Sequence, residues 1–151
     1  MSELPPGLTL SFENEPAWQD RELIDEGLGA LNAPFLRDPR YSYFGLFLRE
    51  AAADASDGAI RAGLIGHCYA GWLFIALLWV HADLRRSGIG SRLIAAAERH
   101  AIEFGCHSAW VDTFSFQAPD FYPKFGYREF ARLDCPPDHH RIFLQKQLVT
   151  E

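Results

Sequence analysis

Cysteine is scarce in this sequence, and its spacing excludes two common uses of the residue. The 151 residues contain three cysteines, Cys68, Cys106 and Cys135, and no C-x-x-C pair. An odd number at irregular spacing is typical neither of a disulfide framework nor of a zinc site. The first residues, MSELPPGLTL, also lack the basic start and the apolar core of a secretory signal. We therefore expect reduced thiols and a cytoplasmic protein.

Positive charge is also in short supply. The chain has 14 Lys and Arg against 20 Asp and Glu, which gives a net charge of -6. This balance disfavours non-specific binding to nucleic acids and mildly favours cationic partners. The apolar run Trp72–Val80 is too short to cross a bilayer. We expect neither a nucleic acid nor a membrane as a partner.

Several ligand-binding motifs are missing as well. His139 and His140 are adjacent rather than one helical turn apart, and no carboxylate pattern accompanies them, so we predict no metal site. The chain has no G-x-x-x-x-G-K-[ST] sequence. The glycine pattern that starts at Gly88 stops short of G-x-G-x-x-G because the last position is Leu93. These absences remove the P-loop and the dinucleotide fingerprint from consideration.

The side chains that are present can fill one core. With 48% hydrophobic and 14% aromatic residues, we predict a single domain over residues 1–151. Periodicity and turn residues predict seven strands and three helices. The strands are Leu8–Phe12, Tyr43–Arg49, Ile60–Tyr69, Trp72–Val80, Ser108–Thr113, Tyr127–Leu133 and His139–Leu148, and the helices are Trp18–Leu31, Ser91–Phe104 and Asp120–Phe125.

The order of these elements predicts a mixed sheet in the α/β class. The second to fourth strands form an antiparallel meander, in which Glu50–Gly58 ends in Asp-Gly and is expected to be a hairpin loop. A strand, the helix Ser91–Phe104 and another strand imply a parallel pair with a right-handed crossover. The last two strands form a hairpin. We expect helices on both faces of this sheet.

The turn before the central helix has the features of an anion site. Ser87-Gly88-Ile89-Gly90 opens the helix, where backbone N–H groups lack intrahelical partners. The glycines allow a large anion to approach the backbone, and Arg85 and Arg86 add positive charge. The alternative is a tight strand-to-helix turn with solvated arginines. On these residues alone, the two interpretations are about equally supported.

The pattern Arg85-x-x-Gly88-x-Gly90, between a strand and a helix, resembles the acetyl-CoA pyrophosphate loop of the GCN5-related N-acetyltransferase (GNAT) family. Leu78-x-Val80 before the turn and Leu93-Ile94 and Ala97-Glu98 after it are similar to the family pattern. The resemblance implies a GNAT-like fold with a twisted sheet of about seven strands, and an acetyl-CoA-dependent N-acetyltransferase. The cofactor-binding residues that it implies are Leu78, Trp79, Val80, Arg85, Arg86, Ser87, Gly88, Ile89, Gly90, Ser91, Ser115, Gln117, Phe121 and Lys124.

A second motif, Ala118-x-x-Phe121-Tyr122-x-Lys124-x-Gly126-Tyr127, resembles the family's other signature. It places Tyr122 where family members hold a tyrosine that protonates, or hydrogen-bonds, the departing CoA sulfur. A phenol, with a pKa of about 10, can supply a proton to a thiolate whose conjugate acid has a pKa of about 8.5. The alternative is a packing role in an aromatic patch. Where the family often has Asn, this chain has Ser115, and Gln117 is a substitute candidate.

The resemblance also implies how the remaining parts work. The strand before the turn and the next strand are expected to diverge, with Leu78–Val80 along the pantetheine arm and a backbone N–H there as the oxyanion donor. That strand lacks the glutamate that many relatives use as a base. Asp112, His81 and His67 are the remaining candidates. A surface or structural role is favoured for each histidine, Asp112 is equally suited to anchoring a loop, and we assign no base.

The sequence gives the least information about the acceptor substrate. The region after the first helix contributes to acceptor pockets in the family, which implies Asn32, Phe35, Arg37 and Tyr41, each of which can equally be a surface or packing residue. The net charge favours a small molecule with a primary amine. A non-catalytic CoA-binding sensor or scaffold and an enzyme that acetylates a protein amine are the alternatives. A homodimer is left open.

Overall fold

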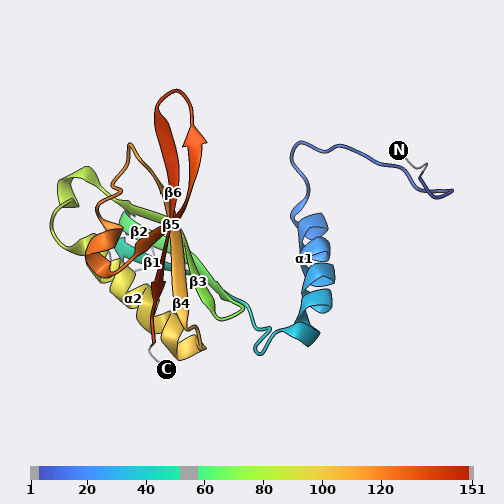
Figure 1. The fold of residues 1–151 in the computed structure, drawn as a ribbon, viewed down its shortest axis with the longest axis horizontal. Helices are drawn as coiled ribbons and strands as arrows, with labels where there is room; N and C mark the ends of the chain where they lie inside the picture. Colours follow the sequence, from blue (N-terminus) through green and yellow to red (C-terminus); the bar gives the residue numbers. More distant parts are fainter. Residues whose placement is uncertain (1–3, 52–57, 150–151) are drawn as a thin grey trace. The chain divides into compact units, whose positions relative to one another are not determined.

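The structure is a computed structural model that describes residues 4–51 and 58–149 (Figure 1). The chain divides into two compact units, Met1–Leu36 and Arg37–Glu151. Part of the expected hairpin loop Glu50–Gly58 lies outside the described residues. At its ends, the Glu50 N–H donates to the Ala59 carbonyl at 2.9 Å, so the two flanking strands meet as the meander requires.

The first unit is built on helix α1, Trp18–Asn32, followed by a short 3-10 helix, Ala33–Phe35. The predicted helix is confirmed. The predicted strand Leu8–Phe12 is wrong, since these residues have no strand structure. The Leu8 N–H bonds to the Pro5 carbonyl in a local turn at 3.2 Å, and a strand forms only where a neighbouring strand takes up its hydrogen bonds.

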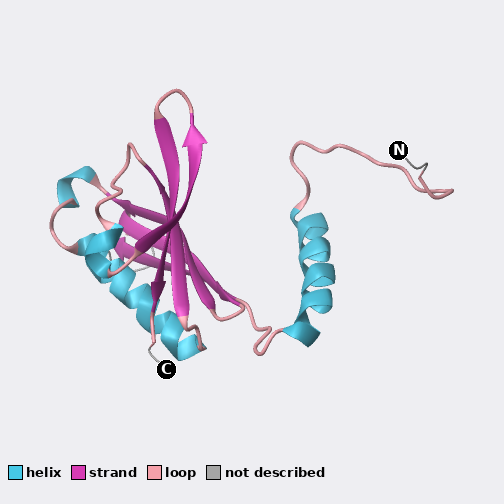
Figure 2. Cartoon of the chain, viewed as in Figure 1, coloured by secondary structure: helices cyan, strands magenta, loops and turns pink. Residues whose placement is uncertain are grey.

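The second unit holds a mixed six-stranded sheet with the order β1-β2-β3-β4-β6-β5 (Figure 2). The strands β3 and β4 are parallel, and the pairs β1–β2, β2–β3 and β5–β6 are antiparallel, as predicted. The antiparallel pairing of β4 with β6 was not predicted. The sheet has six strands rather than seven because the first predicted strand is absent. The strands are β1 Ser42–Arg49, β2 Ile60–Tyr69, β3 Trp72–Val80, β4 Ser108–Phe114, β5 Arg128–Cys135 and β6 His139–Gln147.

Helix α2, Ile89–Phe104, begins two positions before the predicted start. It lies along one face of the sheet (Figure 1), in contact with β2 and β3. Its buried stripe consists of Leu93, Ile94, Ala97 and Ala101. The helix ends at Gly105 as predicted, where the left-handed φ of +107° lets the Gly105 N–H reach the Ala101 and Ile102 carbonyls.

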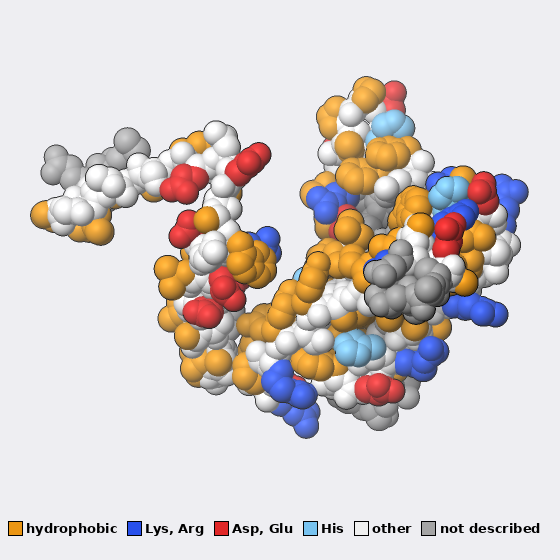
Figure 3. Space-filling view, turned by 180° about the vertical axis from the view of Figure 1, so that it is seen from behind, with side chains coloured by type: hydrophobic (Ala, Val, Ile, Leu, Met, Phe, Trp, Pro, Cys, Tyr) orange, Lys and Arg blue, Asp and Glu red, His pale blue; other side chains and the backbone are white. Residues whose placement is uncertain are grey.

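The core lies between α2 and the inward side chains of the sheet. Leu64, Leu73 and Ile75 from β2 and β3 are at most 1% exposed, and Val111 of β4 joins them. Apolar side chains also lie at the surface of each unit (Figure 3). Burial of the sheet's inner face fixes the position of α2 against β3. The turn between these two elements carries the candidate site.

Candidate active site

A bulge in β3 decides which side chains lie near the turn. Gly66 of β2 pairs with Ile75, but Ile65 pairs with Leu77, so Ala76 is an extra residue. Because side chains alternate along a strand, this insertion reverses the faces after it. Ile75 is 1% exposed and Leu77 is 65% exposed. Without the bulge, Leu77 would face the core.

Beyond the bulge, the expected cofactor residues of β3 separate by face. Leu78 and Val80 pack against the core, whereas Trp79 is 48% exposed. The parallel pairing of β3 with β4 covers only Trp72–Ile75 against Ser108–Val111. Past these residues, the backbone of β3 has no ladder partner on the β4 side. This is the divergence of strands that the family resemblance implies.

The turn after β3 begins with a short 3-10 helix, Ala82–Leu84, and then reaches the arginines. Arg85 Nε donates to the Val80 carbonyl at 3.3 Å, which ties this side chain back to the strand end. Arg86 has a φ of +61°, which is uncommon for a residue with a long side chain. The Ser87 hydroxyl donates to the Leu84 carbonyl. The turn is thus closed by its own hydrogen bonds.

Helix α2 opens directly from this turn. Gly88 is its N-cap with a left-handed φ of +80°, and a β-carbon built there would find nothing closer than Ser91 Oγ at 3.8 Å. The Arg92 N–H bonds to the Gly88 carbonyl at 3.1 Å, so the N–H groups of residues 89–91 precede the first helical bond. The Ser91 hydroxyl donates to the same carbonyl at 2.7 Å. Open space, spare donors and a positive helix end fit a diphosphate.

The second glycine of the turn is required by a contact from the other motif. A β-carbon built on Gly90 would lie 2.9 Å from Phe121 Cζ. Phe121 immediately precedes the 3-10 helix Tyr122–Phe125. The ring therefore seats this short helix against the start of α2. The two motifs, 31 positions apart between Gly90 and Phe121, meet at this contact.

Tyr122 is buried, with 8% of its surface exposed, and follows Phe121, whose ring contacts Gly90. Its ring meets Phe121 edge to face at 5.2 Å between centroids and Tyr127 at 5.9 Å. Burial, aided by the Asp112 carboxylate, raises the pKa of Tyr122 to about 12. At neutral pH the hydroxyl therefore holds its proton. The observed 3-10 helix Tyr122–Phe125 is shorter than the expected helix Asp120–Phe125, because Pro123 limits it to one turn.

A polar network behind Tyr122 was not predicted from the sequence. The Tyr127 hydroxyl donates to Glu98 Oε1 at 3.0 Å, and Lys146 Nζ donates to both oxygens of the same carboxylate at 2.8 Å. Burial and the neighbouring carboxylate raise the pKa of Tyr127. These residues come from α2, β6 and the segment before β5, and they support the ring against which Tyr122 packs. Of these three residues, only Glu98 lies within the sequence that resembles the first family motif, and this was the one signal in the sequence that pointed to the network.

Ser115 and Gln117 form hydrogen bonds that stabilise the loop after β4. The Ser115 N–H donates to the His140 carbonyl at 2.8 Å, and the His140 N–H donates to the Ser115 hydroxyl at 3.0 Å. Gln117 Oε1 accepts from the Thr113 hydroxyl at 3.1 Å and from the Phe114 N–H at 3.0 Å. Both side chains thus close the turn that leads to Tyr122. Lys124 is exposed on the 3-10 helix.

The three candidate bases are all engaged. Arg141 Nε donates to Asp112 Oδ2 at 2.7 Å. His67 packs edge to face against Phe74 at 5.2 Å between centroids, and burial lowers its pKa. His81 Nδ1 accepts from the Asp83 N–H at 3.3 Å. None of these groups is a free base beside Tyr122.

The four candidate acceptor residues are divided between the units. Asn32 ends α1 and Phe35 ends the following 3-10 helix, both in the first unit. Arg37 and Tyr41 belong to the second unit, where the Tyr41 ring contacts His67 at 5.3 Å between centroids. Their role in acceptor binding stays a prediction.

Two further features bear on ligands. A polar surface hollow of about 570 Å³ lies at the start of β3 and β4, away from the turn, and is lined by Trp72, Ser108, Gly126, Arg128, Gln145, Lys146 and Gln147. Within residues 4–51 and 58–149, no group of three or more His, Cys, Asp and Glu could hold a metal ion. No helix in the described part of the chain is long and apolar enough to span a membrane.

Comparison with known proteins gives one consistent result. The sequence profile of the acetyltransferase (GNAT) family matches residues 9–127. A blasticidin-S acetyltransferase from Streptomyces morookaense is 48% identical over 93 residues, which cover 60% of this chain and 68% of that protein. The crystal structure of an acetyltransferase from Bacillus cereus superposes with a TM-score of 0.71 at 31% identity, covering 91% of this chain and 97% of that one.

A more distant structure shares the fold with a bound cofactor. It is provisionally assigned as a streptothricin acetyltransferase from Bacillus anthracis, in complex with acetyl coenzyme A. The TM-score is 0.53 at 22% identity, covering 60% of this chain and 57% of that one. The open helix start, the end of β3 without a partner on the β4 side and the buried tyrosine are consistent with that cofactor. The chain belongs to the acetyltransferase (GNAT) family and is an acetyl-CoA-dependent N-acetyltransferase.

Proposed function

We propose that this enzyme transfers the acetyl group to a primary amine of a small molecule, by direct attack within a ternary complex. The observation that carries the proposal is the contact of Phe121 with Gly90, which seats Tyr122 beside the start of α2. A phosphate-binding helix start and a protonated phenol then lie within one site. The first group suits the diphosphate of acetyl-CoA, and the second suits the sulfur that leaves during acyl transfer.

Each part of the turn has a role in holding the cofactor. Acetyl-CoA supplies the acetyl group as a reactive thioester together with a diphosphate that can be bound. The N–H groups of residues 89–91 and the arginines Arg85 and Arg86 hold the diphosphate. The free backbone of Leu78–Val80 pairs with the amide-bearing arm, and one of its N–H groups stabilises negative charge on the carbonyl oxygen.

Tyr122 acts on the leaving sulfur. The raised pKa, about 12, keeps the Oη proton in place at neutral pH. An ordinary thiol has a pKa of about 8.5, so the phenol is the weaker acid. We infer that Tyr122 first stabilises the departing sulfur with a hydrogen bond and transfers its proton as the carbon–sulfur bond breaks, and that the proton released by the attacking amine restores the phenol. Phe121 and Tyr127 fix the direction of the ring.

No side chain is assigned as the base that removes the proton from the amine. Asp112 is bound to Arg141, and His81 Nδ1 accepts a backbone N–H, so neither is free in this arrangement. Water, or an amine that is already partly neutral, provides the simpler route. The enzyme would then favour acceptors of lowered basicity and work faster as the pH rises.

The acceptor is proposed to be a small molecule because of one relative. The protein at 48% identity is a blasticidin-S acetyltransferase, and a small cationic acceptor suits the net charge of -6. The test is thiol release from acetyl-CoA with blasticidin S, polyamines, aminoglycosides and short peptides. Turnover only with peptides would move the acceptor to protein amines. CoA binding without turnover of any amine would favour the sensor reading.

The remaining assignments follow from the same reading. We propose that residues 1–151 act as one acetyltransferase domain, since the family profile runs through both units. Three free cysteines support a reducing, cytoplasmic location, although burial rather than compartment accounts for two of them, Cys68 and Cys106. We propose no nucleic acid or membrane partner. Sedimentation of the purified chain decides between monomer and homodimer.

A further inference from the structure

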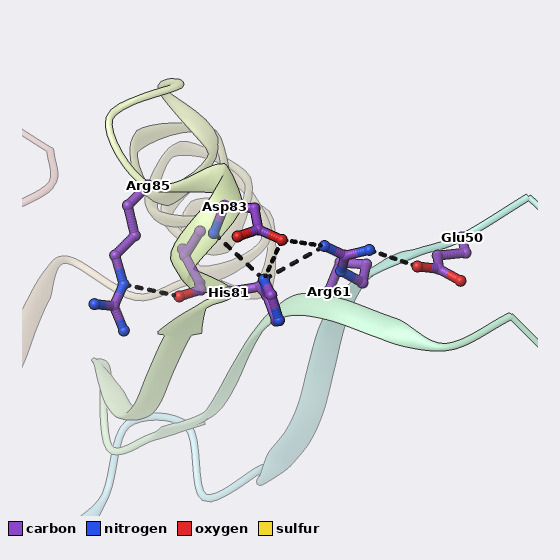
Figure 4. A network of polar contacts seen from close by, with 6 residues as sticks. Glu50, Arg61, His81, Asp83 and Arg85 are labelled. Carbon is purple, nitrogen blue, oxygen red and sulfur yellow. Dashed lines mark hydrogen bonds and ion pairs between the residues drawn. The ribbon is translucent and has the colours of Figure 1, made fainter.

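A polar cluster joins the second strand to the start of the cofactor turn (Figure 4). Its centre is Arg61 of β2, whose side chain is 29% exposed. Arg61 Nη1 donates to Glu50 Oε1 at 2.6 Å. Arg61 Nη2 lies 3.3 Å from His81 Nδ1 and 3.4 Å from Asp83 Oδ2. One guanidinium thus connects the end of β1, the end of β3 and the turn.

The imidazole of His81 takes the acceptor role in this cluster. Its Nδ1 receives the Asp83 N–H at 3.3 Å and faces the Arg61 guanidinium at the same distance. These two donors make Nδ1 the acceptor in our assignment, with the proton on Nε2, while Asp83 Oδ2, 3.4 Å from the same nitrogen, pairs with Arg61 Nη2. His81 is therefore the N-cap of the 3-10 helix Ala82–Leu84. Its backbone is also fixed, because the His81 N–H donates to the Arg61 carbonyl at 2.9 Å.

The capped 3-10 helix Ala82–Leu84 fixes the position of the Arg85 backbone. The Leu84 N–H bonds to the His81 carbonyl at 2.9 Å, and the Arg85 N–H bonds to the Ala82 carbonyl at 3.3 Å. The Arg85 side chain then returns to the Val80 carbonyl at 3.3 Å (Figure 4). Loss of the cap would free the backbone immediately before Arg85. It would leave the core under β3 and α2 intact, since Arg61, His81 and Asp83 are not part of the buried core.

We propose that Arg61 and His81 are positioning residues that fix the turn carrying Arg85 and so set the affinity for acetyl-CoA. This inference rests on the proposed role of Arg85 and the start of α2 in holding the diphosphate. Neither residue touches the reacting atoms in this assignment. Their loss should therefore weaken cofactor binding while the chemical step and the acceptor site keep their properties.

Two conservative pairs of variants test the proposal. His81→Asn keeps an oxygen that can cap the Asp83 N–H, whereas His81→Ala removes the cap. Arg61→Lys keeps one ion pair, whereas Arg61→Met keeps none. Arg132→Met is the matched control, because Arg132 pairs with Glu129 on β5 at 2.9 Å, away from the turn. CoA affinity is measured by calorimetry, and KM and kcat for each substrate are measured in steady state.

We expect about tenfold weaker CoA binding and a similarly raised acetyl-CoA KM in His81→Ala and Arg61→Met, with kcat within twofold and the acceptor KM unchanged. His81→Asn should restore wild-type affinity, and Arg61→Lys should lie between. If circular dichroism shows that Arg61→Met does not fold, the comparison of His81→Ala with His81→Asn still tests the proposal. Equal CoA affinity in wild type and His81→Ala overturns the proposal. Absence of CoA binding by the wild type would instead overturn the proposed function.

Discussion

The ring of Phe121 lies so close to Gly90 that a β-carbon on the glycine would stand 2.9 Å from Phe121 Cζ. This contact joins the start of α2 to the short helix that carries Tyr122. It also explains why glycine is needed inside the first turn of a helix, where it is otherwise unfavourable by about 1 kcal/mol relative to alanine. The turn before α2 and Tyr122 are thereby joined in one corner of the fold.

Gly90→Ala should disturb both functions of this corner. The added methyl group must displace the Phe121 ring, which shifts Tyr122 relative to the helix start. We expect the acetyl-CoA KM to rise and kcat to fall, with kcat/KM lower by about tenfold, which corresponds to about 1.4 kcal/mol. Ala95→Gln, at an exposed position of the same helix, is the control and should match wild type. A fully active Gly90→Ala would show that the contact is dispensable.

Tyr122→Phe separates chemistry from packing. The phenyl ring keeps the contacts with Phe121 and Tyr127, but the proton donor is lost. We predict that kcat falls by up to about 100-fold while calorimetric CoA affinity stays the same. Tyr43→Phe, where the tyrosine is 69% exposed, provides the control. Turnover at the wild-type rate would remove Tyr122 from the mechanism.

The raised pKa of Tyr122 predicts a loss of stability in alkali. Its pKa is about 12 in the folded chain and about 10 unfolded, so its contribution is complete below pH 10 and disappears as the pH rises toward 12. A shift of this size corresponds to about 3 kcal/mol. Urea unfolding at pH 9 to 11.5 should therefore show a shallower decline in Tyr122→Phe than in wild type. If the free energy of unfolding falls equally with pH in wild type and Tyr122→Phe, the raised pKa of Tyr122 is contradicted.

Lys146→Met should destabilise the chain by leaving Glu98 with the Tyr127 hydroxyl alone. The pair is mostly buried, with 24% and 16% of the side chains exposed, and we expect a loss of about 2 kcal/mol. The double variant Glu98→Gln, Lys146→Met should lose less than the sum of the single variants. Equilibrium urea denaturation measures all three. Additive losses would mean that the two charges do not interact.

Asp112→Asn tests the absence of an assigned base. The amide oxygen can still accept from Arg141 Nε, so the loop end should hold its position. We expect kcat/KM within about threefold of wild type and an unchanged rise of rate with pH. A fall of 100-fold or more, together with loss of the pH dependence, would identify Asp112 as the base after all.

The sequence by itself determined most of the strands, the helices α1 and α2 and the glycine positions at the two ends of α2. These features are local: alternation, helical spacing, and glycines at Gly88 and Gly105 that adopt left-handed backbone angles. The glycine and arginine pattern predicts a diphosphate site, and this site stays a prediction. The failure at Leu8–Phe12 shows the limit, since alternation cannot reveal whether a strand has a neighbour.

Only the tertiary structure decided how these pieces combine. The bulge at Ala76 is invisible in a uniformly apolar run, yet it selects which side chains of β3 face the core. The position of β6 between β4 and β5 brings Lys146 to Glu98 across 48 positions of sequence. The pairing of β2 with β3 likewise brings Arg61 to His81. Such contacts depend on strand order and packing, which act over distances that no local pattern encodes.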